Sequence, residues 1–154
     1  MKILNSILWE NEDFKSLLSA INKARLPAAC TGLSHIHKAA IVSAICEQTR
    51  KKAVIITADD ALASELKYDI NSLGVKCINL PSRDYCIGEL EGYSREYEHK
   101  RIHTLSELSD GDFDVLVMSL EAALQYTLPK EKLEKNSFEL KEQNAYDIKE
   151  LAVK

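Results

Sequence analysis

Two short apolar runs constrain the fold of this chain more than any other feature. Residues 53–57 read AVIIT, and residues 114–119 read DVLVMS. Each run is long enough for a strand and too short for a helix. An uninterrupted β-branched run is typical of a strand in a parallel sheet that helices cover on both faces. We therefore expect 53–57 to be covered on both faces and 114–119 to be a buried strand.

Segments with helical spacing of apolar residues alternate with strand-like segments. We expect helices at 12–24, 35–50, 60–73, 94–108 and 120–128, and strands at 26–32, 53–57, 75–80 and 114–119. Asp59 or Asp60 can cap the third helix, and Gly74 can end it. Strands that alternate with helices form a parallel sheet with helices on both faces, so we predict an α/β fold.

Size, charge and cysteine content limit the classes of protein. The chain has 154 residues, 45% of them hydrophobic, which suits one domain with a sizeable core. The net charge of −4 argues against a broad, sequence-independent nucleic-acid surface. The four cysteines form no CxxC pair, so we expect neither a disulfide nor a zinc framework. With no signal-peptide core and no stretch long enough to cross a membrane, we expect a cytoplasmic protein.

The turn into the second helix carries part of a phosphate-binding pattern. A working loop reads G-x-x-x-x-G-K-[ST]: the glycines let the backbone curl around the phosphates, the lysine reaches them, and the hydroxyl holds magnesium. Here Gly32 and Lys38 match, but His37 stands in place of the second glycine and Ala39 in place of the hydroxyl. An imidazole fills the space that the backbone needs, and an alanine cannot coordinate a metal.

Two interpretations of this loop follow from the residues. It is either a nucleotide site, or a turn without that function, which is a vestigial loop or a plain strand-to-helix turn. The substitutions at His37 and Ala39 favour the second. We therefore expect no catalytic residue, no bound cofactor and no metal in this chain.

Other candidate positions favour ordinary surface roles. His99 and His103 share a helical face, but no third ligand is evident, so we expect a solvated face. Arg83, Asp84 and Tyr85 follow the strand at 75–80, at the sheet edge where α/β proteins bind ligands. They form either the relic of a ligand-facing loop or domain contact, or a surface turn, and the residues favour neither. Glu96 and Lys100 are spaced for an ion pair on one helix.

The chain changes character after Pro129. Residues 130–154 are polar, with one weak strand and one short helix, which cannot form a core alone. We therefore expect an α/β domain at 1–128, and a linker with the truncated start of a second domain at 129–154.

An ordered series of segments resembles the N-terminal module of the bacterial transcription-repair coupling factors. The series, quoted in chain order, is TGLSHIHKAAIVSAI, AVIITADDALASELKYDINSLG, INLPSRDY, YSREYEHKRIHTLSELSDGDFDVLVMSLEAALQYTLP and SFELKEQNAYDIKELA. No one segment is highly specific. Together they cover nearly all of the chain from about residue 26 on.

The resemblance implies a fold and a role. The family's module is similar to the first domain of UvrB, of the P-loop helicase-like class, with a phosphate loop that no longer binds ATP. The role implied is recruitment of UvrA, largely through the second domain. Contacts with RNA polymerase and DNA, and ATP hydrolysis with magnesium, belong to other domains of such a protein.

Overall fold

The computed structural model describes residues 7–83 and 96–138. Residues 7–10 are helical. The further elements, in chain order, are α2 (Glu12–Asn22), α3 (His35–Thr49), β1 (Ala53–Thr57), α4 (Asp60–Ser72), β2 (Cys77–Leu80), α5 (Glu96–Asp110), β3 (Val115–Ser119), α6 (Leu120–Leu124) and α7 (Lys130–Lys135). None of the described helices is both long and apolar enough to span a lipid bilayer.

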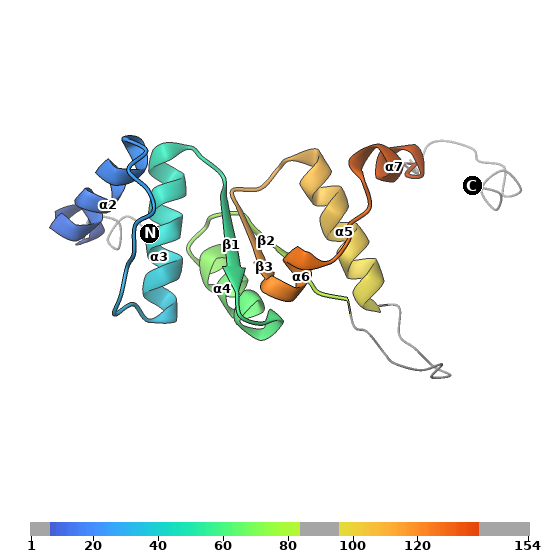
Figure 1. Ribbon diagram of the computed structural model, residues 1–154, viewed down its shortest axis with the longest axis horizontal. Helices are drawn as coiled ribbons and strands as arrows, with labels where there is room; N and C mark the ends of the chain where they lie inside the picture. Colours follow the sequence, from blue (N-terminus) through green and yellow to red (C-terminus); the bar gives the residue numbers. More distant parts are fainter. Residues whose placement is uncertain (1–6, 84–95, 139–154) are drawn as a thin grey trace, which may run out of the picture.

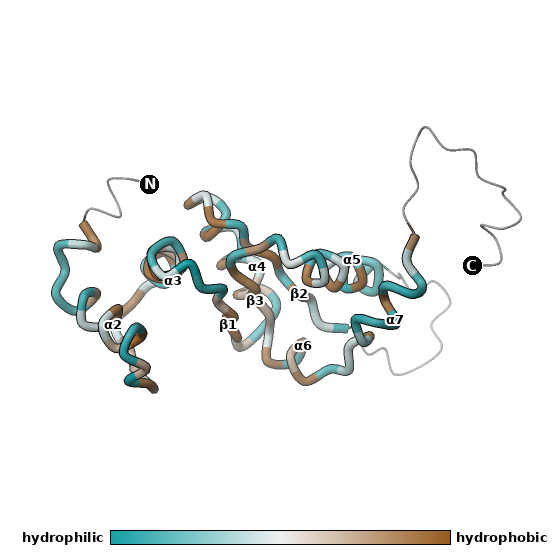
Figure 2. The backbone as a smooth tube through the Cα atoms, turned by 90° about the horizontal axis from the view of Figure 1, so that it is seen from above, coloured by the Kyte–Doolittle hydropathy of each residue, from teal (hydrophilic) through white to brown (hydrophobic). Residues whose placement is uncertain are grey.

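The three strands form one parallel sheet in the order β1-β3-β2. Ala53 of β1 and Cys77 of β2 both align with Val115 of β3. The central strand is the most buried, because Val115 and Val117 are fully covered. Figures 1 and 2 show the sheet in the middle of an elongated molecule, with α2 near one end and α7 near the other. The predicted α/β class and parallel sheet are confirmed.

Helices cover the two faces of this sheet unequally. On one face, Leu66 and Ile70 of α4 pack with Val115 and Val117. The opposite face carries Ile78, Leu80 and Leu116, which pack with Leu105 and Leu108 of α5. Side chains alternate between faces along a strand, so the buried residues of β3 separate cleanly into these two sets. Helices on both faces, as predicted, therefore hold for β2 and β3.

The prediction that both faces of β1 are covered was wrong. Its residues Ala53 and Ile55 pack with the α4 cluster. Val54 and Ile56 point to the other face and are 62% and 57% exposed. The reason is the position of α5, which contacts β2 and leaves the edge strand uncovered. An apolar run shows that a strand can be buried on both sides, but not whether a neighbour is there to bury it.

The predicted strand at 26–32 does not form. This segment is extended, and residues 26–32 are exposed. Among the described residues, no main-chain hydrogen bond ties 26–33 to the rest of the chain. A strand exists only when its backbone pairs with a neighbour, and β1 has β3 as its one partner in the sheet. Cys30, which lies in this segment, is consequently exposed.

The N-terminal helices form a separate layer against α3. Phe14 and Leu18 of α2 pack with Ala44 of α3. The Trp9 ring meets Phe14 edge to face, with centroids 5.5 Å apart. On its other side α3 contacts α4, so α3 joins the N-terminal layer to the sheet.

Several helix boundaries match the predictions. Asp59 caps α4 by accepting a hydrogen bond from the Leu62 N–H at 2.8 Å. Gly74 follows with a φ of +79°, the left-handed conformation that favours glycine after a helix. The helix expected at 120–128 is shorter and ends at Leu124. Gln125 turns to extended backbone there, and its side chain exchanges two hydrogen bonds with the main chain of Arg83.

The described cysteines form no disulfide, and two of them lie in the core. Cys30, Cys46 and Cys77 are free thiols, and Cys86 lies outside the described residues. Burial raises the pKa of the Cys77 thiol to about 12. Burial, followed by the charge of Asp114, also raises the pKa of Cys46. Both side chains are therefore neutral and act as small apolar residues.

Candidate functional site

The turn from residue 31 to residue 38 has part of the backbone geometry of an anion-binding loop. Gly32 has a φ of +74°, and a side chain there would meet no atom within 4 Å. Ser34 is the extended residue that precedes α3, but its hydroxyl does not cap the helix backbone. It instead pairs with Nδ1 of His37 at 3.0 Å. The turn therefore keeps the first glycine's conformation and replaces the cap with a side-chain pair.

The first turn of α3 begins with amides that have no partner within the helix. The Lys38 N–H bonds back to the Ser34 carbonyl at 3.1 Å, which starts the helix. The three preceding amides, His35 to His37, have no intrahelical partner because every helix leaves its first amides open. No acidic residue occupies this turn. The turn is electropositive because Lys38 is exposed there and the helix dipole adds positive charge at the N-terminus.

The side chain of Ala39 points away from this turn and into the core. Ala39 is fully buried and belongs to the core cluster that includes Leu66 and Ile70 of α4. Ala40 beside it is also buried. A methyl group has no lone pair for a metal, and its place in the core leaves no room for an ion and its water shell. The chemistry that a phosphate loop needs at this position is missing from the described residues.

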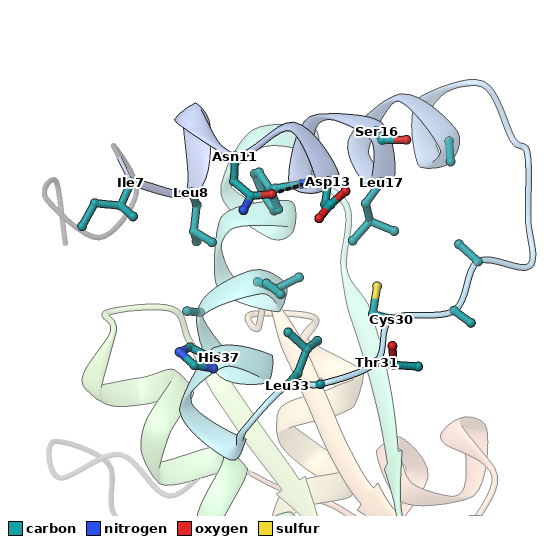
Figure 3. Close-up of a pocket in the computed structure, with 17 residues that line it drawn as sticks. Ile7, Leu8, Asn11, Asp13, Ser16, Leu17, Cys30, Thr31, Leu33 and His37 are labelled. Atoms are coloured by element: carbon teal, nitrogen blue, oxygen red, sulfur yellow. Dashed lines mark hydrogen bonds between the residues drawn. The ribbon is translucent and has the colours of Figure 1, made fainter.

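A groove lies next to the same turn. It has a volume of about 790 Å³ and runs between α2, the extended segment 28–33 and the start of α3. Figure 3 shows Leu17 on the α2 side, Cys30 and Thr31 on the extended segment, and His37 toward α3. Most of the lining is apolar, including Leu8, Leu17, Leu33 and Ile41. Such a surface offers contact area for a side chain and few donors for phosphate.

A second polar cluster lies where the three strands end. The Asp60 carboxylate accepts hydrogen bonds from the Ser82 hydroxyl at 2.6 Å and from the Ser82 N–H at 2.9 Å. Partial burial alone raises the pKa of Asp60, but hydrogen bonds from Ser119 and Ser82 and the charge of Arg101 outweigh it, so the pKa is lowered. Asp60 is therefore ionised at neutral pH. Its contribution to stability is present at pH values above the pKa of Asp60 in the unfolded chain, and it is lost as the pH falls through the lowered pKa of the folded state.

Arg101 is the residue that sequence reasoning missed. It is only 3% exposed, which is unusual for an arginine. Its guanidinium donates to the Pro81 carbonyl at 2.6 Å and to the Ala122 carbonyl at 3.3 Å. It thus joins α5 to the end of β2 and to α6. The signal in the sequence was its spacing, since Arg101, Leu105 and Leu108 share one helical face.

The other predicted positions lie outside both the turn before α3 and the Asp60 cluster. His99 and His103 are exposed, as expected, and no group of metal-ligating side chains occurs among the described residues. The ion pair of Glu96 and Lys100 forms at 2.6 Å. Arg83 makes backbone contacts with Gln125, whereas Asp84 and Tyr85 lie outside the described residues.

The turn before α3 lies outside the three-stranded sheet. Ligands of open α/β sheets bind beyond the carboxyl ends of the strands. Figure 1 shows α3 starting at that end of the molecule, but α3 stands outside the three-stranded sheet. The electropositive turn and the Asp60 cluster are thus two separate features.

The chain is similar to a transcription-repair coupling factor. Over 139 residues it is 24% identical to the Transcription-repair-coupling factor of Bacillus subtilis (strain 168). The similarity covers 89% of this chain and 12% of that protein's length. The resemblance predicted from the sequence is therefore confirmed. No family model matches the chain, and no solved structure matches it either.

Substituting Arg101 tests whether the buried guanidinium holds the strand ends together. We expect Arg101→Met to lower the free energy of unfolding by roughly 3 kcal/mol, because two buried carbonyls lose their donor while the aliphatic stem remains. The control is Lys100→Met, which removes an exposed ion pair from the same helix and costs about 0.5 kcal/mol or less. Urea unfolding followed by circular dichroism measures both. Equal effects of the two substitutions would contradict the role of Arg101.

Proposed function

We propose that this chain is a non-catalytic module of a transcription-repair coupling factor, with the fold of the first domain of UvrB. Its role is to support the recruitment of UvrA to stalled RNA polymerase in transcription-coupled nucleotide-excision repair. The observation that carries the proposal is the similarity to the Bacillus subtilis factor over most of this chain. The chain acts in the cytoplasm.

The turn at residues 32–39 supports the non-catalytic part of the proposal. ATP hydrolysis needs a magnesium ion held by a hydroxyl and a backbone that wraps the phosphates. Ala39 is in the core, and the imidazole of His37 stands where the pattern requires a glycine. Lys38 alone is a surface charge. We infer that this P-loop-like turn is degenerate and serves as part of a scaffold.

The partners follow from the role of such a protein. The proposed contact with UvrA is made mainly by the second domain, which begins after about residue 129. RNA polymerase and DNA are bound by other domains of the parent protein, where ATP and magnesium drive translocation. The net charge of −4 supports this division, because this chain offers no broadly basic surface to DNA.

A nucleotide-binding domain of a UvrB-like or helicase-type ATPase is the second candidate. The conformation of Gly32, the exposed Lys38 and the open amides of α3 favour it. The two candidates differ at His37 and Ala39. If this chain bound ATP, it would have to hold the nucleotide and its magnesium ion without the second glycine and the hydroxyl of the P-loop pattern.

Isothermal titration calorimetry with ATP and magnesium separates these two functions. We expect no binding up to about 1 mM nucleotide, because a few open amides and one lysine give only weak attraction. The same titration is made with Lys38→Ala and with Lys51→Ala, a matched loss of one exposed lysine elsewhere. Micromolar binding that Lys38→Ala abolishes and Lys51→Ala preserves would overturn the non-catalytic proposal.

Retention of purified UvrA by the immobilised chain tests the recruitment role. Because the second domain makes most of the proposed contact, we expect residues 1–154 alone to retain little UvrA. The comparison is a version of the natural protein that is longer by about a hundred residues, a typical domain's length. We expect that version to retain at least about tenfold more. Equal retention would refute the assignment of the contact to the second domain, and no retention by either would refute the recruitment role.

A further inference from the structure

The extended segment 26–33 has a backbone without a partner. Its sequence, LPAACTGL, has the composition of a strand. Among the described residues, no main-chain hydrogen bond ties it to the rest of the chain. Residues 26–32 are exposed, so water satisfies their amides and carbonyls. An extended segment with a row of such open groups is a template for pairing with another extended chain.

The groove between α2 and the start of α3 runs along this segment. Every residue from 28 to 33 lines it, so the backbone of the segment itself forms one wall. Leu17 of α2 and Ile41 of α3 line the other walls. Figure 3 shows the Cys30 side chain directed from the segment toward α2, across the groove. The volume of about 790 Å³ lies within the usual range of ligand pockets.

The charges around the groove select an acidic partner. Residues 14–46 contain no aspartate or glutamate, although the net charge of the chain is −4. Lys23 and Arg25 stand before the extended segment, Lys38 follows it, and all three are exposed. In the part of the chain that the structure describes, none of the three makes an ion pair. Asp13 is the acidic residue that lines the groove, from the α2 side. Both ends of the segment are therefore basic.

We propose that this groove binds an extended, acidic peptide segment of a partner protein, which adds as a strand to residues 28–33. Main-chain hydrogen bonds to the segment supply the affinity, as in other proteins that accept an added strand. Side chains alternate along a strand, so every second residue of the peptide enters the groove and is apolar. Acidic residues at the two ends of the peptide lie near Arg25 and Lys38. This inference does not depend on the proposed function.

Two other occupants fit the groove less well. A second copy of this chain would bring its own segment 26–33 with the same basic flanks, and like charges would then face each other. A nucleic acid carries the right charge, but the lining is mostly apolar and offers few donors for phosphate. A short acidic peptide buries little area, so we expect a dissociation constant of about 10–100 µM.

Fluorescence anisotropy with a dye-labelled synthetic peptide measures this binding. The probe has two glutamates on each side of Val-Thr-Val-Thr-Val. One control peptide has lysines in place of the glutamates, and another has threonines in place of the valines. We expect both controls to bind at least about tenfold more weakly, because each lacks one of the two features that the groove selects. No binding of the probe up to about 1 mM, or equal binding of the lysine peptide, would overturn the proposal.

Methylated peptides test whether the probe pairs as a strand. Neighbouring residues of a strand direct their amides to opposite edges, so only alternate residues of the peptide bond to the segment. One variant of the probe carries N-methyl groups on the valine amides, and the other carries them on the threonine amides. We expect one variant to bind about tenfold or more weakly and the other to bind like the probe. Equal affinities of the two variants would contradict strand addition.

Alkylation of Cys30 tests the location. In a Cys86→Ser chain, Cys30 is the exposed thiol of the described residues, since Cys46 and Cys77 are buried. We expect saturating probe to slow the reaction of Cys30 with iodoacetamide by at least about fivefold. Binding that leaves this rate unchanged would place the peptide elsewhere and overturn the proposal.

Paired substitutions test the groove in the chain itself. Lys38→Glu should weaken probe binding by about fivefold or more at low salt, whereas Lys67→Glu, an equal charge change on α4, should not. Leu17→Gln should weaken it as well, whereas Tyr68→Gln, at an exposed position on α4, should leave it unchanged. Equal effects within both pairs would contradict the assignment. So would amides of residues 28–33 that are protected from deuterium exchange in the free chain, since another part of the chain would then cover the segment.

Discussion

The parallel pairing of β3 with β1 and β2 is the constraint on which the rest of the structure depends. Val115 and Val117 direct their side chains to α4, and Leu116 directs its side chain to α5, so one strand supplies both cores. The same pairing brings the ends of the strands together, where Arg101 and Asp60 connect the loops. An ionised arginine with 3% exposure is stable there because carbonyls accept its donors and a carboxylate balances its charge.

The position of α3 outside this sheet determines what the N-terminal turn can do. Because the segment before α3 has no strand partner, the turn is not held between neighbouring strands as a phosphate loop is. The core takes up Ala39 on the other side, and the Ser34–His37 pair occupies the cap. What remains is an electropositive helix start beside an apolar groove.

The sequence predicted the local features well and the pairing of strands poorly. The strands at 53–57 and 114–119, the Asp59 cap and the Gly74 end follow from residue type and spacing, which act within a few residues. The segment 26–32 has the composition of a strand, but strand formation needs a distant partner that composition does not reveal. Arg101 was missed because charged residues are usually exposed, and only the carbonyls that it meets in three dimensions explain its burial. For the candidate site, the sequence alone showed that His37 and Ala39 replace the second glycine and the hydroxyl of the P-loop pattern. The burial of Ala39 required the three-dimensional structure.

We propose that the turn at residues 32–39 does not hold a nucleoside triphosphate. A ¹⁵N–¹H correlation spectrum recorded while ATP and magnesium are added tests it most directly, because the amides of Gly32 and of His35 to Lys38 would donate to any bound phosphate. We predict that these signals move no more than those of exposed amides elsewhere, such as Lys67. Saturable shifts confined to Gly32 and the first turn of α3, at micromolar nucleotide, would contradict the account.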